Sequence, residues 1–181
     1  DGALWVDGER VDLVYNRLTD FYLVEERHSA LRRAVEAGAA VVTPNPAAHA
    51  RWADKRLLAW LREEALLEAA GLDAAERRHL LASIPPTEIV TPEAANSLWR
   101  RRKALFFKPV DGYGSKAAYR GSGLTRSTFE HILAGRYVAQ AVAPTSTRRV
   151  VVGNEATDLR VDVRSSRHAG WSMPSVSRSF E

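Results

Sequence analysis

The sequence has no cysteine among its 181 residues, which excludes a disulfide framework and a cysteine-ligated metal. It also lacks any apolar run near the roughly 18 residues of a membrane span. Its first residues, DGALWVDGER, lack the features of a signal peptide. We therefore expect a protein that does not enter membranes and that works in the cytoplasm. Methionine occurs once, at Met173, and the chain begins with Asp1, so we expect it to be part of a longer protein.

Positive charge is in modest excess, with a formal net charge of +4 at pH 7 and a pI of about 9.7. This balance favours phosphate-bearing ligands and, less specifically, nucleic acid. The densest basic run, residues 100–103, follows a helix signal in which Thr91 is the expected N-cap and Pro92 the first helical residue. This helix is expected over residues 92–103, and cations in its last turn interact favourably with its dipole. We favour this structural role for the run over a nucleic-acid contact.

Strand and helix signals alternate along the chain and indicate an α/β fold. Two β-rich runs joined at Asp7-Gly8 predict a hairpin. Further strands are expected at residues 39–45, 104–110, 137–144, 147–153 and 158–164. Helices are expected at residues 28–38, 48–71 (the longest), 74–84, 92–103 and 124–135. The serine-rich tail, residues 165–181, has no hydrophobic period and is expected to be irregular.

The stretch FFKPVDGYGSKAAYRGSG, residues 106–123, places Lys108 at the end of an apolar strand, before a loop with four glycines. Glycine lets the backbone approach a ligand closely, and clustered backbone N–H groups bind anions. Residues 112–117 formally fit the dinucleotide pattern G-x-G-x-x-G/A, but that pattern requires a helix to begin at its second or third glycine. Gly121 and Gly123 follow too soon for such a helix and predict a second short strand or hairpin instead. The P-loop pattern is absent.

The order of three features resembles the ATP-grasp superfamily. Lys108 precedes a glycine-rich loop, Asp54-Lys55 opens a helix further upstream, and the strand YVAQAVAP leads into a hinge of the kind that contacts adenine. The segment DLVYNRL is similar to those ahead of the nucleotide site in uncharacterised and glutathionylspermidine-synthase-like members. The resemblance covers roughly residues 10–164.

This resemblance implies an α/β, ATP-grasp-like fold with mixed sheets, flanking helices and a glycine-rich lid. It implies an N-terminal α/β segment at residues 1–46, a nucleotide-binding region at 47–164 and an irregular tail at 165–181. Arg160 is the residue that it assigns to the substrate. It assigns ATP to the following residues: Lys55, Lys108, Gly112, Tyr113, Gly114, Ser115, Lys116, Gln140, Ala141 and Val142.

Four of these residues also have a plainer interpretation. Lys108 could be a strand-end lysine that extends its ammonium to water, Lys55 a solvated helix residue, and Ser115 and Lys116 mere loop surface. The stretch DLRVDVR, residues 158–164, alternates apolar and charged residues. Its charged face is either a solvated sheet surface or the floor of a cleft.

The activity that the resemblance implies is an ATP-dependent carboxylate–amine or carboxylate–thiol ligase that acts through an acylphosphate. Its partners would be ATP and an unidentified small-molecule or peptide carboxylate, not nucleic acid. The family also implies Mg²⁺, yet no ligands are found, because the strand positions of Asp158 and Asp162 do not match those of the family. Either the ligands lie beyond this chain, or the chain is a non-catalytic relative that serves as a nucleotide-binding or interaction domain.

Overall fold

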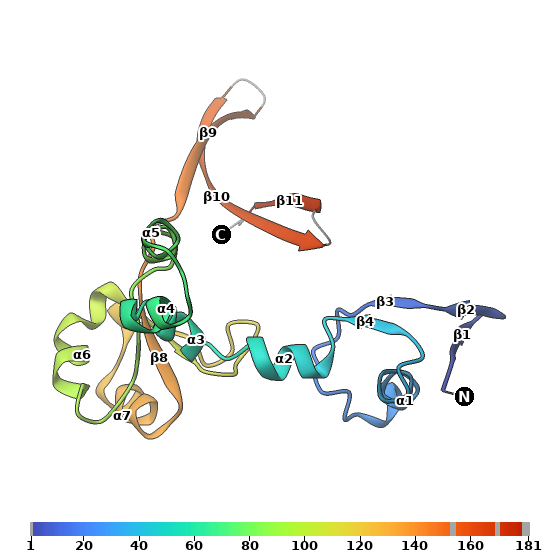
Figure 1. The fold of residues 1–181 in the computed structure, drawn as a ribbon. Coiled ribbons are helices and arrows are strands. Elements are labelled where there is room, and N and C mark those ends of the chain that lie inside the picture. The colour runs from blue at the N-terminus through green and yellow to red at the C-terminus, as the bar shows by residue number, and fades with distance from the viewer. Residues whose placement is uncertain (1, 153–154, 169–170, 179–181) are drawn as a thin grey trace. The chain divides into compact units, whose positions relative to one another are not determined.

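The computed structural model describes residues 2–152, 155–168 and 171–178. The chain divides into two compact units, residues 1–141 and 142–181, and each is described by itself (Figure 1). The boundaries inferred from the sequence, at residues 46 and 164, stay a prediction. No helix in the described ranges has both the length and the apolar character that crossing a membrane requires.

The N-terminal hairpin forms as predicted. Strands β1 (Leu4–Val6) and β2 (Glu9–Val11) pair in antiparallel fashion around Asp7 and Gly8, whose φ angles are 52° and 82°. Positive φ at both central residues is the requirement of a type I′ turn, which Asp-Gly satisfies.

A small parallel sheet follows the hairpin. Strand β3 (Leu13–Tyr15) pairs with β4 (Val41–Thr43), and the crossover contains helix α1 (Ser29–Glu36). A 3-10 turn (Glu26–His28) precedes the helix. Gly38, with φ of 61°, follows α1 and ends it as predicted, because glycine adopts the left-handed conformation of a helix stop without strain.

The long helix predicted at residues 48–71 is wrong. The chain forms three short helices there: α2 (Pro46–Trp52), α3 (Arg56–Trp60) and α4 (Glu64–Ala69). Between α2 and α3, a side-chain oxygen of Asp54 accepts from the backbone N–H of Arg56 at 2.8 Å. The backbone N–H of Lys55 donates instead to the carbonyl of Val110, at 3.0 Å. These two bonds take the backbone out of the helical hydrogen-bond pattern.

The helix after this region forms as the sequence predicts. Helix α5 (Ala74–Ser83) begins with a capping box in which Asp73 accepts from the N–H of Glu76, while the Glu76 carboxylate accepts from the N–H of Asp73. Its C-cap residue, Ile84, is followed by Pro85, which cannot continue a helix.

The rest of the first unit contains a four-stranded antiparallel sheet and the helices that cover it. Its strands lie in the order β5 (Thr87–Ile89), β8 (Tyr137–Ala141), β6 (Leu105–Pro109) and β7 (Tyr119–Arg120). Helices α6 (Ala95–Arg101) and α7 (Arg126–Ala134) lie close to β8 (Figure 1). The side chains of Leu98, Phe107 and Ile132 are fully buried in one cluster, so these helices cover one face of the sheet.

Two predictions about these helices have different outcomes. Helix α7 has Thr125 as its N-cap and Gly135 as its C-cap, as predicted. Helix α6 begins three residues later than residue 92, because the carbonyl of Thr91 accepts from the N–H of Ala94 in a turn that precedes the helix. The basic run then divides between α6 and the 3-10 turn Arg102–Ala104.

The second unit is a three-stranded antiparallel sheet in the order β11–β10–β9. Its strands are β9 (Ser146–Val152), β10 (Glu155–His168) and β11 (Trp171–Arg178). The prediction of an irregular tail is therefore wrong for residues 165–168 and 171–178. Pairing with β10, in a register that places Val163 opposite Val176, orders a serine-rich segment whose own pattern carries no strand signal.

Candidate functional site

Lys108 lies on the sheet face opposite the helices. Side chains alternate along β6, so the buried Leu105 and Phe107 point into the core while Phe106 and Lys108 point the other way. The Lys108 Nζ atom donates to the Oε1 atom of Gln140 at 2.7 Å, and the lysine side chain is partly buried. A bond to a neutral amide leaves the ammonium its charge and two further protons for another acceptor.

Lys55 is half-buried and bonded to the loop. It is therefore not the solvated helix residue of the plainer interpretation. Its Nζ atom donates to the carbonyl oxygen of Gly112 at 2.5 Å and to that of Val110 at 3.5 Å. Burial lowers the pKa of the Lys55 ammonium, the nearby Asp111 carboxylate raises it in part, and the positive charge of Lys108 lowers it further. Lys55 is thus bonded to the backbone directly after β6, the strand that carries Lys108, although the sequence separates the two lysines widely.

The first part of the glycine loop is largely exposed and partly left-handed. Gly114, Ser115 and Ala117 have φ angles of 58°, 59° and 53°, and the last two are strained for residues with a side chain. The Lys116 Nζ atom lies 5.0 Å from the centre of the Tyr113 ring. The loop returns into β7 rather than into a helix, which confirms that this is not a dinucleotide-binding turn.

The glycines of the stretch have different structural roles, which the sequence analysis treated alike. Only Gly114 has positive φ, while a Cβ at Gly112 would collide with the ring of Pro109. Gly121 is buried, and a Cβ there would collide with the backbone carbonyl of Arg102. Gly121 therefore allows two backbone segments to pack closely, and Gly123 faces open space.

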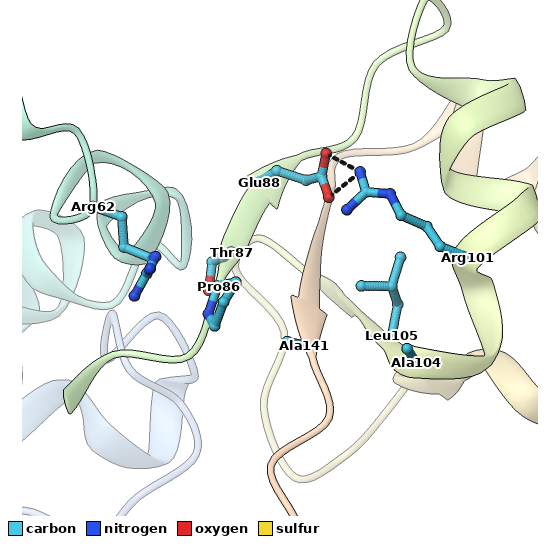
Figure 2. Close-up of a pocket in the computed structure, with 8 residues that line it drawn as sticks. All are labelled: Arg62, Pro86, Thr87, Glu88, Arg101, Ala104, Leu105 and Ala141. Carbon is cyan, nitrogen blue, oxygen red and sulfur yellow. Dashed lines mark hydrogen bonds and ion pairs between the residues drawn. The ribbon is translucent and has the colours of Figure 1, made fainter. Parts of the chain in front are cut away.

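The predicted adenine hinge has one of its residues at a cavity. Ala141 lines a cavity of about 430 Å³. The other lining residues, which the sequence analysis did not single out, are Arg62, Pro86, Thr87, Glu88, Arg101, Ala104 and Leu105. Figure 2 shows the Arg101 guanidinium turned toward the Glu88 carboxylate, to which it is bonded at 2.6 Å.

The other two hinge residues lie on either side of Ala141 in sequence. Gln140 is buried, and its amide joins the face that carries Lys108. Val142 follows β8 and is half-buried. A contact between these residues and adenine stays a prediction.

The residues predicted from the alternating strand lie in the second unit. In β10, Asp158 is exposed and opposite Arg149, and Arg160 is exposed and opposite Thr147. The side chain of Asp162 lies outside the described residues. The assignment of Arg160 to a substrate stays a prediction.

The one cluster of three possible metal ligands found among the described residues does not fit a magnesium site. Within the described residues, one group of possible ligands, Asp20, Glu25 and His28, brings its atoms within 4.8 Å of one another. Both oxygens of Asp20 already accept hydrogen bonds, one from Val24 N–H at 3.1 Å and the other from Glu25 N–H at 2.9 Å and His28 Nδ1 at 2.8 Å. Mg²⁺ requires an octahedral shell of oxygen ligands, which this bonded cluster does not offer.

The Asp20 cluster instead holds a loop together. The hydrogen bond from His28, with those from the backbone, lowers the pKa of Asp20 to about 2 despite the opposing effect of burial. The loop buries Leu23 completely, with a φ angle of 54°. Sequence reasoning missed this cluster, because its three side chains meet only through the fold of the loop.

No protein-family model matches the chain, and no curated protein matches it. The solved structures that are similar to it include three of the ATP-grasp ligase PsnB. The complex with a phosphomimetic variant of a minimal precursor, Mg and ADP has a TM-score of 0.44 and 19% identity, and the match covers 100% of this chain and 63% of that one. The complex with the minimal precursor, Mg and ADP has a TM-score of 0.40 and 21% identity, covering 87% and 55%.

The third structure, PsnB with the minimal precursor, has a TM-score of 0.38 and 20% identity, and the match covers 86% of this chain and 49% of that one. The chain thus spans about half to three-fifths of the length of these ligase chains. At TM-scores below 0.5, this distant likeness to part of an ATP-grasp ligase does not establish the family of the chain.

Proposed function

We propose that residues 47–141 bind the phosphates of ATP in an ATP-grasp-like manner. The observation that carries this proposal is that the Lys55 ammonium is bonded to the backbone directly after β6, the strand that carries Lys108, beside an exposed glycine loop. Two like charges raise the free energy of the site, so an anion placed between them is stabilised. The triphosphate of a nucleotide is an anion of sufficient charge to take bonds from both ammonium groups and from loop N–H groups.

Each part of the site has a separate role in this proposal. Lys108 and Lys55 donate to phosphate oxygens, and residues 112–116 close over them as a lid with backbone N–H groups. Gln140, Ala141 and Val142 lie at the strand end where the base would bind. In this proposal, the phosphates of the nucleotide lie toward the loop and its base lies toward the end of β8.

The reaction that we propose for the whole protein is the ligation of a carboxylate to an amine or a thiol. A carboxylate oxygen takes the terminal phosphoryl group of ATP as the bond to ADP breaks. The amine or thiol then forms a bond to the acyl carbon, phosphate leaves, and the proton of the nucleophile passes to solvent. The acceptor is a small molecule or a peptide carboxylate, and Arg160 is proposed as a residue that contacts it.

A second function is favoured by one observation: in the one cluster of three possible ligands found among the described residues, both oxygens of Asp20 are already hydrogen-bonded. Phosphoryl transfer relies on metal ions that bridge phosphate oxygens. A chain that binds nucleotide without such ligands would serve as a nucleotide-binding or interaction domain. In the ligase proposal, acidic ligands outside the described residues complete the metal site.

Calorimetric titration of this chain with ATP, and with adenosine as the uncharged control, tests the phosphate site. We expect ATP to bind and adenosine to bind far more weakly. Equal affinities for the two would contradict a site built on the lysines. ADP release measured with Mg²⁺ and candidate carboxylates then separates the ligase from the binding domain.

A further inference from the structure

A row of three polar side chains crosses the sheet face that carries Lys108. Gln140 lies in the central strand β8, with Thr87 of β5 opposite on one side and Phe106 of β6 opposite on the other. Its side chain is buried, with 8% of its surface exposed. A buried amide must have partners on both its oxygen and its nitrogen.

The direction of the hydrogen bonds along this row fixes the orientation of the amide. The Thr87 hydroxyl donates to the carbonyl of Pro85 at 2.8 Å. A hydroxyl has one proton, so the same oxygen can only accept on its other side, and it accepts from Gln140 Nε2 at 2.9 Å. The Oε1 atom of Gln140 then faces Lys108 Nζ, at 2.7 Å.

The reverse orientation of the amide would be unfavourable. It would turn the NH₂ group of Gln140 toward the ammonium of Lys108, so that two donors faced each other. It would also leave the Thr87 oxygen opposite a carbonyl oxygen while its proton is already used. The Pro85 carbonyl thus fixes the direction of the Thr87 hydroxyl proton. The Thr87 oxygen then fixes the orientation of the Gln140 amide, and the amide oxygen holds the Lys108 ammonium.

We propose that Thr87 and Gln140 are positioning residues that hold the Lys108 ammonium in place for phosphate. This inference rests on the proposed function, in which Lys108 donates to ATP. One proton of the ammonium is held by Gln140 Oε1, which fixes the direction of the other two. A fixed donor loses less conformational freedom when a phosphate binds than a mobile one does.

Affinity for ATP in a double-mutant cycle tests this role, with Thr87→Val in the natural chain and in a Lys108→Met background. Valine keeps the shape of threonine but cannot accept from the amide. We expect Thr87→Val to weaken ATP binding about three- to tenfold in the natural chain, and less than about twofold in the Lys108→Met background. Equal losses in the two backgrounds would overturn the inference, because Thr87 would then act without Lys108.

Two further variants separate positioning from folding. Thr87→Ser keeps the hydroxyl and should restore the affinity, whereas a loss as large as that of Thr87→Val would overturn the inference. Thr43→Val makes the same change at a half-buried threonine in β4 and should leave ATP affinity unchanged. A loss as large at Thr43 would also overturn the inference, because the effect would then follow from any threonine lost from a strand.

Nuclear Overhauser contacts in the chain without ATP test the geometry independently of the proposed function. The side-chain amide protons of Gln140 should give stronger contacts to the side chain of Thr87 than to the ε-methylene of Lys108. The opposite order of strengths would overturn the inference, because the amide oxygen would then face Thr87. If Lys108→Met alone leaves ATP affinity unchanged, the phosphate site fails, and these contacts still decide the orientation of Gln140.

Discussion

The ammonium of Lys55 donates to the carbonyl oxygen of Gly112 at 2.5 Å, which connects the start of α3 to the glycine loop. The backbone of the same lysine donates to Val110, the residue directly after β6. A helix start and a strand end, far apart in the sequence, are thus held together at the point where the loop begins. We expect ATP to compete with Gly112 for this ammonium.

Lys108→Met should weaken ATP binding far more than Lys103→Met. Lys108 is partly buried and bonded to Gln140, whereas Lys103 is exposed in the basic run. A charge-assisted hydrogen bond contributes about 1.5–3 kcal/mol, so the affinity should fall roughly ten- to hundredfold. Calorimetry measures both variants, and similar affinities for the two would remove the phosphate assignment of Lys108.

The affinity for ATP should fall as the pH rises, and the fall should begin at lower pH than for Lys55→Arg. Burial lowers the pKa of Lys55, so its ammonium loses the proton earlier than that of an exposed lysine. Arginine keeps its charge over this range. Titrations between about pH 7 and 10 follow the change, and identical pH profiles for the two proteins would contradict it.

Asp20→Asn should destabilise the first unit at neutral pH. The pKa of Asp20 is lowered to about 2 from an ordinary value of 3.8. A lowered carboxyl pKa stabilises the fold above the unfolded value and loses that contribution as the pH falls through the folded value. The two proteins should therefore differ in urea midpoint above about pH 4 and converge toward pH 2. A difference that stays constant across this range would exclude the ionised carboxylate as the cause.

Gly121→Ala should destabilise the protein, while Gly123→Ala should not. The added methyl at Gly121 meets the backbone carbonyl of Arg102, whereas that at Gly123 meets open space. Overpacking costs roughly 1–3 kcal/mol, and neither glycine has positive φ. Denaturant unfolding compares the two, and equal stabilities would show that the segment near Gly121 moves to accommodate the methyl group.

Amide exchange in residues 111–118 should slow when ATP is added. This segment is mostly exposed and makes few backbone hydrogen bonds, two of which are Lys116 N–H to Tyr113 and Ala118 N–H to Ser115. Such segments open at low free energy. The ladder between β6 and β8 is the internal control and should change little. A loop already protected without ATP would exclude a lid.

Local signals in the sequence were reliable where a short motif has one structural solution. The Asp7-Gly8 turn, the Asp73 cap and the Thr125 cap all form as predicted, because each depends on residues close in the sequence. The strand of Lys108 and the short strand after the loop were predicted for the same reason. The long helix predicted at residues 48–71 does not form, because the backbone of Lys55 pairs with Val110 of another segment.

The sequence by itself determined that Lys108 ends an apolar strand before a glycine loop, since alternation and glycine placement are local properties of the chain. Only the tertiary structure decided which groups meet there. Antiparallel pairing of β8 with β5 and β6 brings Thr87, Gln140 and Lys108 into one hydrogen-bonded row. The physical reason is that hydrogen bonds and charges act over a few ångströms of space, and the register of distant strands, which no local pattern encodes, sets those distances.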